Sequence, residues 1–383
     1  MKEKLNERQQ RAIEHFKGPA LVLAGPGSGK TRTITYRTKY MIEHYRVNPS
    51  SILVITFTKA AAMEMKQRFL AMTDRKYVTV SFGTFHAVFF GILRHAYGYT
   101  ADNIIREEQR NRFFKEEISH MDLEIEDEAE FIQNILGEIS RVKNERRNIL
   151  EYEALSCDIK SFRKLYQKYD NMLRRQNLLD FDDMLVYTYE LLSQRKDILR
   201  AWQNKFQYIL IDETQDMNQL QYDIVKLLAA PRNNLFMVGD VKQSIYGFRL
   251  SDPEIFLARQ KKYTLDSEKG EGVAPIYFND NFRSDNQILQ FVNGVFSYAM
   301  TEGTAGVNYK DDASFNQVTD PERNEGRVEV HVFQGKSGSP VQAGELYHLC
   351  DHQNPESTES ATEQEGKYIA DEIKRLMART HLT

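Results

Sequence analysis

The sequence contains few cysteines and prolines, no long hydrophobic run and no strong excess of either charge. It has 2 cysteines and 9 prolines among 383 residues. Cys157 and Cys350 stand far apart, without a neighbouring cysteine or histidine cluster. This pattern argues against a disulfide-rich secreted domain and against structural zinc, and it is typical of a reducing compartment. We therefore expect a cytoplasmic protein.

Membrane segments and a strongly basic surface are also missing. No apolar run approaches the roughly 20 residues that a membrane-spanning helix needs. The polar opening MKEKLNE predicts no signal peptide. The 51 basic and 55 acidic residues give a formal net charge of −4. Any nucleic acid must therefore be bound by a local groove rather than by a global positive field.

What is present is an ordinary globular composition, with 41% hydrophobic and 28% charged residues. A chain of this length predicts two or three domains. Several short runs are apolar or β-branched on both faces, as the strands of a helix-covered parallel sheet are. These predicted strands are 20–24, 51–57, 78–82, 208–212 and 235–239.

The segment between Phe85 and Gln207 has no such run. Its charged sequence carries apolar residues at helical spacing, and it is too long for a loop. We expect a helical domain at 86–206 inserted into a first α/β domain formed by 1–85 and 207–265. Residues 266–275 resemble a linker, and 274–383 are expected to form a partial second α/β domain with strands at 274–278 and 327–333. Within it, 334–365 have the composition of a mobile loop, followed by a helix at 367–377.

The most informative stretch runs from Ala20 to Thr31 and reads ALVLAGPGSGKT. An apolar strand leads into a glycine-rich loop, and a helix follows whose positive N-terminal dipole favours an anion. The glycines allow backbone N–H groups to surround a polyphosphate, while Lys30 reaches the outer phosphates and the Thr31 hydroxyl ligates Mg²⁺. This pattern predicts binding of a nucleoside triphosphate. The loop comprises Ala24, Gly25, Pro26, Gly27, Ser28, Gly29, Lys30, Thr31 and Arg32.

Two further strands end in polar residues that suit this chemistry. The strand YILI ends in Asp212 and Glu213, where Asp212 can hold Mg²⁺ and Glu213 can activate the attacking water. The strand LFMVG runs into a loop in which Gln243 can sense the γ-phosphate. In the same loop, Tyr246 and Phe248 offer flat faces on which nucleic-acid bases can stack.

The order of these motifs resembles that of the UvrD/PcrA/Rep family of superfamily-one DNA helicases, over nearly the whole chain. LNERQ near the N-terminus, DETQD at 212–216, the loop at 239–249 and NFRS at 281–284 all match motifs of this family. The resemblance implies a P-loop, RecA-like fold with an inserted helical domain and a partial second RecA-like domain. It also implies an ATP- and Mg²⁺-dependent 3′–5′ DNA helicase that serves DNA repair, with single-stranded DNA and duplex junctions as partners.

The resemblance also assigns roles to residues. Gln9 is expected to contact adenine, Phe282 to stack on it, and Arg283 to reach across the cleft as an arginine finger. Glu213, Lys30, Gln243 and Arg283 form the expected catalytic set. The expected DNA contacts are Phe57, Thr58, Thr84, His86, Tyr246 and Phe248.

Some positions depart from the family pattern. Lys59 and Ala60 replace Asn-Lys, Thr214 replaces an aromatic residue, Gly247 replaces Arg, and Phe248 replaces Trp. The stretches VKQSIY and FVNGVF lean toward the AddA/RecB branch, whereas LLDFDDML leans toward UvrD. The family's later motifs, including a final arginine motif, are not found before residue 383. We therefore expect an N-terminal part of a longer protein.

Alternatives of other classes remain open. The chain could be a nucleotide- and DNA-binding module that is inactive alone, or part of an AddA-like helicase–nuclease. A P-loop kinase or transporter ATPase would leave QSIY and NFRS unexplained. The basic run at 141–147 is expected to be a solvated helix face rather than a duplex-binding patch. Asp180 is expected to cap a helix whose first turn carries further acids.

Overall fold

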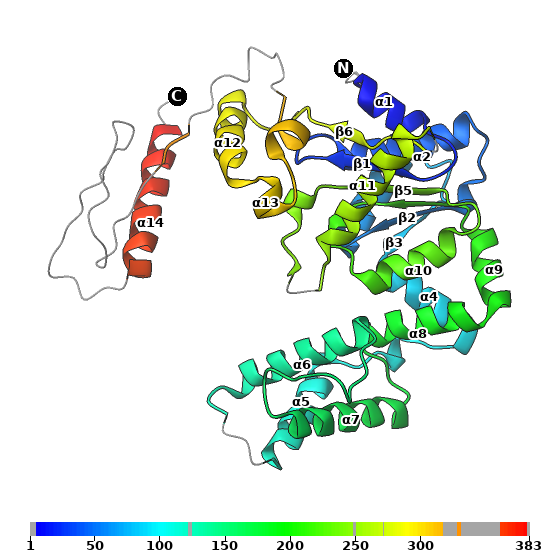
Figure 1. Cartoon of the computed structure of the whole chain (residues 1–383), viewed down its shortest axis with the longest axis vertical. Helices are drawn as coiled ribbons and strands as arrows, with labels where there is room; N and C mark the ends of the chain where they lie inside the picture. The colour runs from blue at the N-terminus through cyan, green and yellow to red at the C-terminus, as the bar shows by residue number, and fades with distance from the viewer. Residues whose placement is uncertain are drawn as a thin grey trace. The chain divides into compact units, whose positions relative to one another are not determined.

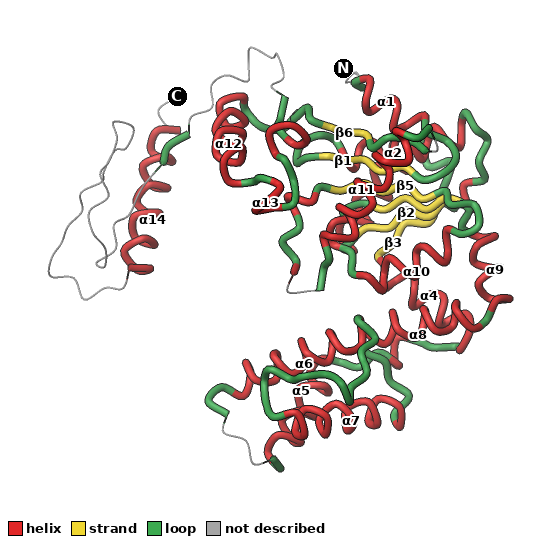
Figure 2. The backbone as a smooth tube through the Cα atoms, viewed as in Figure 1, coloured by secondary structure: helices red, strands yellow, loops and turns green. Residues whose placement is uncertain are grey.

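The computed structural model describes residues 5–121, 125–247, 250–270, 272–316, 328–330 and 361–380. Within these ranges, six strands form one parallel sheet in the order β3-β2-β4-β5-β1-β6 (Figure 2). The predicted α/β fold with a parallel sheet is confirmed. The strands are β1 (Ala20–Ala24), β2 (Ile52–Thr56), β3 (Ser81–Thr84), β4 (Tyr208–Ile211), β5 (Leu235–Gly239) and β6 (Ile276–Phe278).

Helices cover both faces of the sheet, which explains why every residue of β2 and β5 is buried. On one face, apolar side chains from the first three helices pack in one core. These helices are α1 (Glu7–Glu14), α2 (Lys30–Glu43) and α3 (Lys59–Met72). A second core covers the other face. Its helices are α4 (Phe85–Tyr97), α8 (Phe181–Gln194), α9 (Lys196–Lys205), α10 (Gln219–Ala229) and α11 (Pro253–Glu268).

A third core belongs to the inserted segment alone. It is formed by apolar residues between Ile105 and Leu178 and contains no strand residue. Its helices, grouped away from the sheet in Figure 1, are α5 (Glu107–Ser119), α6 (Glu128–Asn144) and α7 (Ile159–Arg175). The predicted helical insertion therefore has two parts. α5 to α7 make a separate helical body, whereas α4, α8 and α9 share their core with the sheet.

Two strand predictions need correction. The strand predicted at 78–82 begins later, at Ser81, because Val80 is still held in a turn by its hydrogen bond to the Tyr77 carbonyl. The strand predicted to open a second domain is β6, which pairs with β1 as the edge strand of the first sheet. Arg8 of α1 also donates to the Tyr277 carbonyl, which ties β6 to this sheet.

The remaining segments lie directly before β6 and beyond it. The predicted linker at 266–275 is still helical up to Glu268. Of the strand predicted at 327–333, only 328–330 are described, and they have no regular structure; the loop predicted at 334–365 lies outside the described residues apart from the start of α14. The predicted C-terminal helix is confirmed within a longer one. The described helices after β6 are α12 (Asn286–Ala299), α13 (Glu302–Ala305), a π-helical turn (Tyr309–Ala313) and α14 (Ala361–Thr380).

The chain divides into two compact units. The first comprises 1–284 and 293–319, and the second comprises 285–292 and 320–383. All the predicted site residues lie in the first unit. In the second, Arg375 of α14 lies 3.5 Å from Glu329. No helix among the described residues combines the length and apolar character needed to cross a membrane.

Candidate active site

The loop between β1 and α2 has the backbone of an anion cradle. Gly27 and Gly29 adopt φ angles of 72° and 87°, which residues with a side chain rarely adopt. Gly29 is also the N-cap of α2 and provides no side-chain cap, so first-turn N–H groups of α2 remain available to a ligand. Ser28 is buried and its Oγ donates to the Gly25 carbonyl at 2.6 Å, which closes the turn. Arg32 lies over the Tyr36 ring.

Two buried amides hold this loop from outside. The Gln9 Nε2 donates to the Ser28 carbonyl at 2.9 Å, and the Gln9 Oε1 accepts from the Asn6 backbone N–H. The Asn281 Nδ2 donates to the Pro26 carbonyl at 2.8 Å. The expected contact of Gln9 with adenine stays a prediction, but its amide is already part of the loop's support.

The acidic pair lies where β4 ends. Asp212 is 4% exposed, and the neighbouring Thr31 side chain favours its charged form. Burial and the nearby charge of Glu213 raise the pKa of Asp212 to about 7. Glu213 has a left-handed backbone, with φ 54° and ψ 46°. Such a conformation costs a non-glycine residue of the order of 1 kcal/mol and is often found at functional sites.

Five residues from three segments form a closed set of hydrogen bonds, which we call the polar ring: Lys30, Glu213, Gln215, Asp240 and Gln243. The Lys30 Nζ lies 3.0 Å from the Glu213 Oε2 and 3.0 Å from the Gln243 Oε1. The Gln243 Nε2 donates to the Asp240 Oδ2 at 2.8 Å. Gln215 closes the ring by donating to Glu213 and accepting from the Asp240 backbone N–H. Three of the four residues predicted to be catalytic therefore lie together.

The fourth, Arg283, stands in the loop that follows β6. The Asn281 Oδ1 accepts from the backbone N–H groups of Arg283 and Ser284, directly after β6. An added Cβ on Gly27 would lie 2.9 Å from the Arg283 Cβ. The Cβ of Arg283 therefore lies beside the phosphate loop, and its expected reach across the cleft as an arginine finger stays a prediction. Phe282 is 37% exposed, and its N–H donates to the Gly27 carbonyl.

Two of the three aromatic residues predicted to contact DNA, Phe57 and Tyr246, meet at the same edge of the sheet. Phe57 follows β2 and Tyr246 follows β5, and their rings stack with centroids 5.8 Å apart and planes 16° apart. Both are only partly buried. Together they form a flat apolar surface. It lies next to the polar ring, because the Ser244 hydroxyl, two residues before Tyr246, donates to the backbone carbonyl of Gln215, a member of that ring.

The other predicted DNA contacts have structural roles as well. The Thr58 and Thr84 hydroxyls cap α3 and α4 by accepting from backbone N–H groups. His86 packs edge-on against Phe181, and burial lowers its pKa, which favours the neutral ring. Phe248 lies outside the described residues. Contacts of these four residues with DNA stay predictions.

Residues 5–264 match the model of the UvrD/REP helicase N-terminal domain. The chain belongs to the UvrD/REP helicase family. Similar proteins include YjcD of Bacillus subtilis (37% identical over 297 residues; 74% of this chain and 37% of YjcD). A DNA helicase II homolog of Mycoplasma capricolum is 36% identical over 297 residues, covering 76% of this chain and 40% of the homolog. The ATP-dependent DNA helicase PcrA of Staphylococcus aureus is 35% identical over 302 residues, with the same shares of 76% and 40%.

Family membership confirms the resemblance found in the motifs and the RecA-like P-loop fold. The chain spans about two fifths of the length of these relatives. The UvrD/REP match ends at residue 264, before the NFRS motif. The geometry around Asn281 therefore adds an observation that the family match does not cover.

In the basic run at 141–147 of this UvrD/REP chain, the three arginines are exposed as expected, whereas Lys143 belongs to a buried ionic cluster. Lys143 is 6% exposed, and its Nζ lies 2.7 Å from both Asp180 Oδ2 and Asp183 Oδ1. Burial alone would lower the pKa of Lys143, but the two carboxylates outweigh it and hold that pKa well above its usual value. Lys143 is therefore an internal counter-ion. The predicted cap is confirmed, because the Asp180 side chain accepts from the Asp183 N–H.

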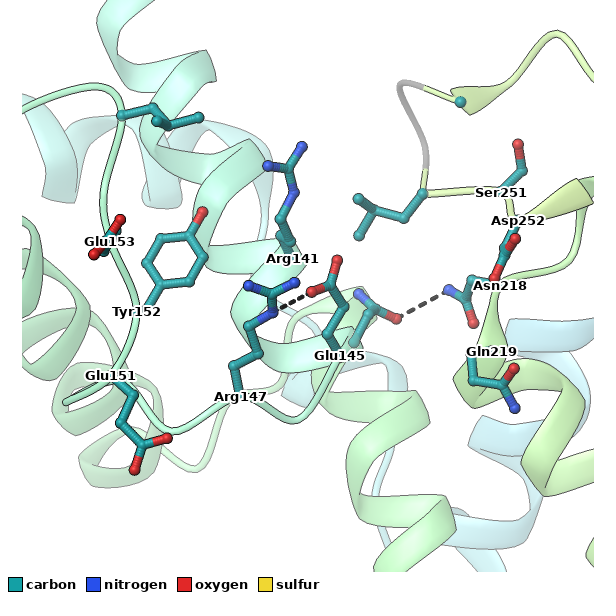
Figure 3. A pocket seen from close by; sticks show the side chains of 14 residues that line it. Arg141, Glu145, Arg147, Glu151, Tyr152, Glu153, Asn218, Gln219, Ser251 and Asp252 are labelled. Carbon is teal, nitrogen blue, oxygen red and sulfur yellow. Dashed lines mark hydrogen bonds and ion pairs between the residues drawn. The ribbon is translucent and has the colours of Figure 1, made fainter. Parts of the chain in front are cut away.

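The C-terminal end of α6 borders a cavity of about 620 Å³. Figure 3 shows Arg141 and the Arg147–Glu145 ion pair on one side and Ser251 and Asp252 on the other. Asn144 and Asn218 join the two sides through a 3.0 Å hydrogen bond. Both charge signs line the cavity, so its walls present no uniformly basic surface to a polyanion.

Sequence reasoning missed the supporting residues of the site. Gln215 and Asp240 had no assigned role, although both stand within motifs that were recognised. Asn281 was recognised only as part of NFRS. All three are buried polar residues within four positions of the end of a strand, and a buried polar residue needs hydrogen-bond partners. Lys143 gave no signal, because its partners lie 37 and 40 residues further along the chain.

Proposed function

We propose that this chain is the ATP-binding and hydrolysing part of a helicase that moves 3′ to 5′ along single-stranded DNA. The observation that carries the proposal is the polar ring beside the glycine loop. It brings the lysine, the acid and the glutamine of three separate motifs to within hydrogen-bonding distance. Family membership and the names of the relatives support the choice of ATP and DNA.

In this proposal, the chain's own residues divide the work of hydrolysis. The loop N–H groups and Lys30 bind the β- and γ-phosphates. Glu213 orients the attacking water and takes its proton as the oxygen bonds to the γ-phosphorus and the bond to the bridging oxygen breaks. Gln243 faces the γ-phosphate, and Arg283, in the loop after β6, adds positive charge near it. Gln9 and Phe282 hold the adenine.

The residues around Asp212 fit Mg²⁺. The donors are oxygens only, as this hard cation prefers. Burial disfavours the charged form of Asp212, so this carboxylate gains from a nearby cation. The Oδ1 of Asp216 is buried and makes no hydrogen bond within the described structure. Thr31 and Asp212 would hold the ion, which would neutralise charge on the phosphates. We propose direct or water-mediated ligation by these two residues.

Binding of single-stranded DNA is proposed for the edge formed by Phe57 and Tyr246. Bases that stack on such faces bind without sequence preference. Thr58, Thr84, His86 and Phe248 are the further proposed contacts. Because Tyr246 and Gln243 stand in one short loop, a change at the γ-phosphate can move the stacking surface.

The test is ATP binding and hydrolysis by the chain, with and without single-stranded DNA. We expect DNA to stimulate hydrolysis. Glu213→Gln should keep ATP·Mg²⁺ binding and lose hydrolysis by a factor of at least about 10². Lys30→Ala should instead weaken nucleotide binding itself. Retained turnover in the first variant, or unchanged affinity in the second, would contradict the assigned roles.

One alternative has an observation in its favour. The chain covers about two fifths of its relatives, which supports a module that binds nucleotide and DNA but needs further residues for turnover. Binding of both ligands without hydrolysis under any condition would favour this alternative over an independent ATPase.

A further inference from the structure

Gln215 is the most completely engaged side chain near the acidic pair. It is 1% exposed. Its Nε2 donates to the Glu213 Oε2 at 2.7 Å, and its Oε1 accepts from the Asp240 backbone N–H at 2.9 Å. One planar amide thus connects the carboxylate at the end of β4 to the backbone at the end of β5.

The fit around this amide is tight. A Cβ added to Gly239 would lie 2.6 Å from the Gln215 Oε1 and 3.0 Å from a ring carbon of Phe256. The Gln215 carbonyl also accepts from the Ser244 hydroxyl at 3.2 Å. Gln215 therefore cannot move far without displacing the backbone of β5 or the loop that follows it.

Glu213 has no comparable support of its own. Its left-handed backbone carries the carboxylate into the polar ring, where the Oε2 is shared between Lys30 and Gln215. Phosphate groups bound in the glycine loop compete for Lys30, because the same ammonium group that meets Glu213 has to neutralise them. When Lys30 turns to phosphate, the donation from Gln215 remains.

We propose that Gln215 is a positioning residue that holds the Glu213 carboxylate in place for the attacking water while Lys30 is engaged by phosphate. The inference rests on the proposed role of Glu213 as the base. Gln215 touches neither the phosphates nor the water in this scheme. It acts through Glu213, and it fixes that carboxylate relative to β5 rather than to the nucleotide.

If the Glu213 carboxylate is displaced, ATP hydrolysis should slow while the affinity for nucleotide stays the same. A misplacement of about 1 Å at a reacting group can lower a rate by up to about 10². We expect Gln215→Met, which keeps the volume and removes the side-chain hydrogen bonds to Glu213, Asp216 and Asp240, to slow single-turnover ATP hydrolysis by about 10- to 100-fold. The dissociation constant of a fluorescent ATP analogue with Mg²⁺ should change by less than about twofold, since phosphate binding is left intact.

The matched control is Gln221→Met. Gln221 is also a buried glutamine, and its Oε1 accepts only the Asn218 backbone N–H, in the cap of α10. This variant should hydrolyse ATP at close to the wild-type rate. Gln215→Glu tests the donor specifically, because it keeps the shape but presents an acceptor to Glu213; it should be at least as slow as Gln215→Met.

The decisive comparison is a double-mutant cycle with Glu213→Ala. Once Glu213 is absent, Gln215→Met should have no further effect on hydrolysis. Equal slowing in both backgrounds, or slowing no greater than that of Gln221→Met, would overturn the proposal. A parallel loss of nucleotide affinity would also overturn it, because it would show a general collapse of the site.

The four proteins of this cycle are the wild type, Gln215→Met, Glu213→Ala and the double variant. They also separate a failure of the positioning proposal from a failure of the proposed function. If the wild-type chain does not hydrolyse ATP with or without DNA, the proposed catalytic function of this chain alone fails. The cycle is then evaluated on the denaturant midpoints of unfolding, which need no turnover. Non-additive midpoint shifts would support the hold of Gln215 on Glu213, and additive shifts would overturn it.

Discussion

Lys143→Met should destabilise the protein strongly, although the residue is far from the polar ring in sequence and stands in a run that resembles a solvated basic surface. The ammonium group of Lys143 is the positive partner of both Asp180 and Asp183, with each N–O distance 2.7 Å. Methionine fills a similar volume but leaves two buried carboxylates facing each other. Removing one partner of a buried ion pair typically costs about 3–5 kcal/mol.

The loss should depend on pH in a defined direction. Burial and the charge of Asp180 already raise the pKa of Asp183 to about 7, against the opposing effect of Lys143. Without Lys143 that pKa rises further, and the folded variant binds a proton that the unfolded chain releases. Stability of the variant therefore falls as pH rises through this range. The free energy of unfolding that Lys143→Met loses relative to wild type should therefore be larger at pH 8 than at pH 6.

The assay is denaturant unfolding at both pH values, followed by far-UV circular dichroism and by the fluorescence of Trp202, the single tryptophan. Lys115→Met is the control, because the Lys115–Glu128 pair is about half exposed and should contribute less than about 1 kcal/mol. Adding Asp183→Asn to Lys143→Met should recover part of the loss. A penalty below about 1 kcal/mol at pH 8, or one that is independent of pH, would refute the reasoning.

Two further predictions concern the proposed ligands. Tyr246→Ala should weaken binding of single-stranded DNA by about 1–3 kcal/mol at fixed salt, measured by fluorescence anisotropy; the exposed Tyr298, changed to Ala, should have no effect, and equal losses would deny the stacking surface. Mg²⁺ should raise the midpoint temperature of unfolding less at pH 6 than at pH 8. At pH 6 the Asp212 carboxyl, with a pKa of about 7, is mostly protonated and binds the cation less well. Asp212→Asn should abolish this difference, and its persistence would assign the ion to other ligands.

The sequence predicted the sheet, the phosphate loop and the acidic pair because each depends on short-range patterns. An apolar run followed by Gly-rich or acidic residues fixes both a strand and the chemistry at its end. The position of β6 could not be predicted in this way. A strand of three residues carries too little pattern to indicate its neighbour, and its pairing with β1 depends on contacts such as Arg8 with the Tyr277 carbonyl.

Side-chain partners were harder to predict than backbone elements. Lys143 and its acids, or Gln215 and the Asp240 N–H, are joined across different elements, and no spacing rule reports such pairs. Helix periodicity gave the correct type for α6 but the wrong environment for Lys143. The reason is physical: a lysine at the end of an amphipathic helix is solvated unless another element brings its counter-ions.

The strand order has a consequence for how the protein is made. β1 emerges first during synthesis, yet its neighbours in the sheet are β5 and β6, which begin at residues 235 and 276. More than two hundred residues, including the whole helical insertion, must be synthesised before both edges of β1 can pair. Such non-local pairing slows folding and exposes unpaired strand edges meanwhile. The segment that carries the phosphate loop thus leaves the ribosome before the other strands of its sheet and has to wait for the last of them to reach its final surroundings.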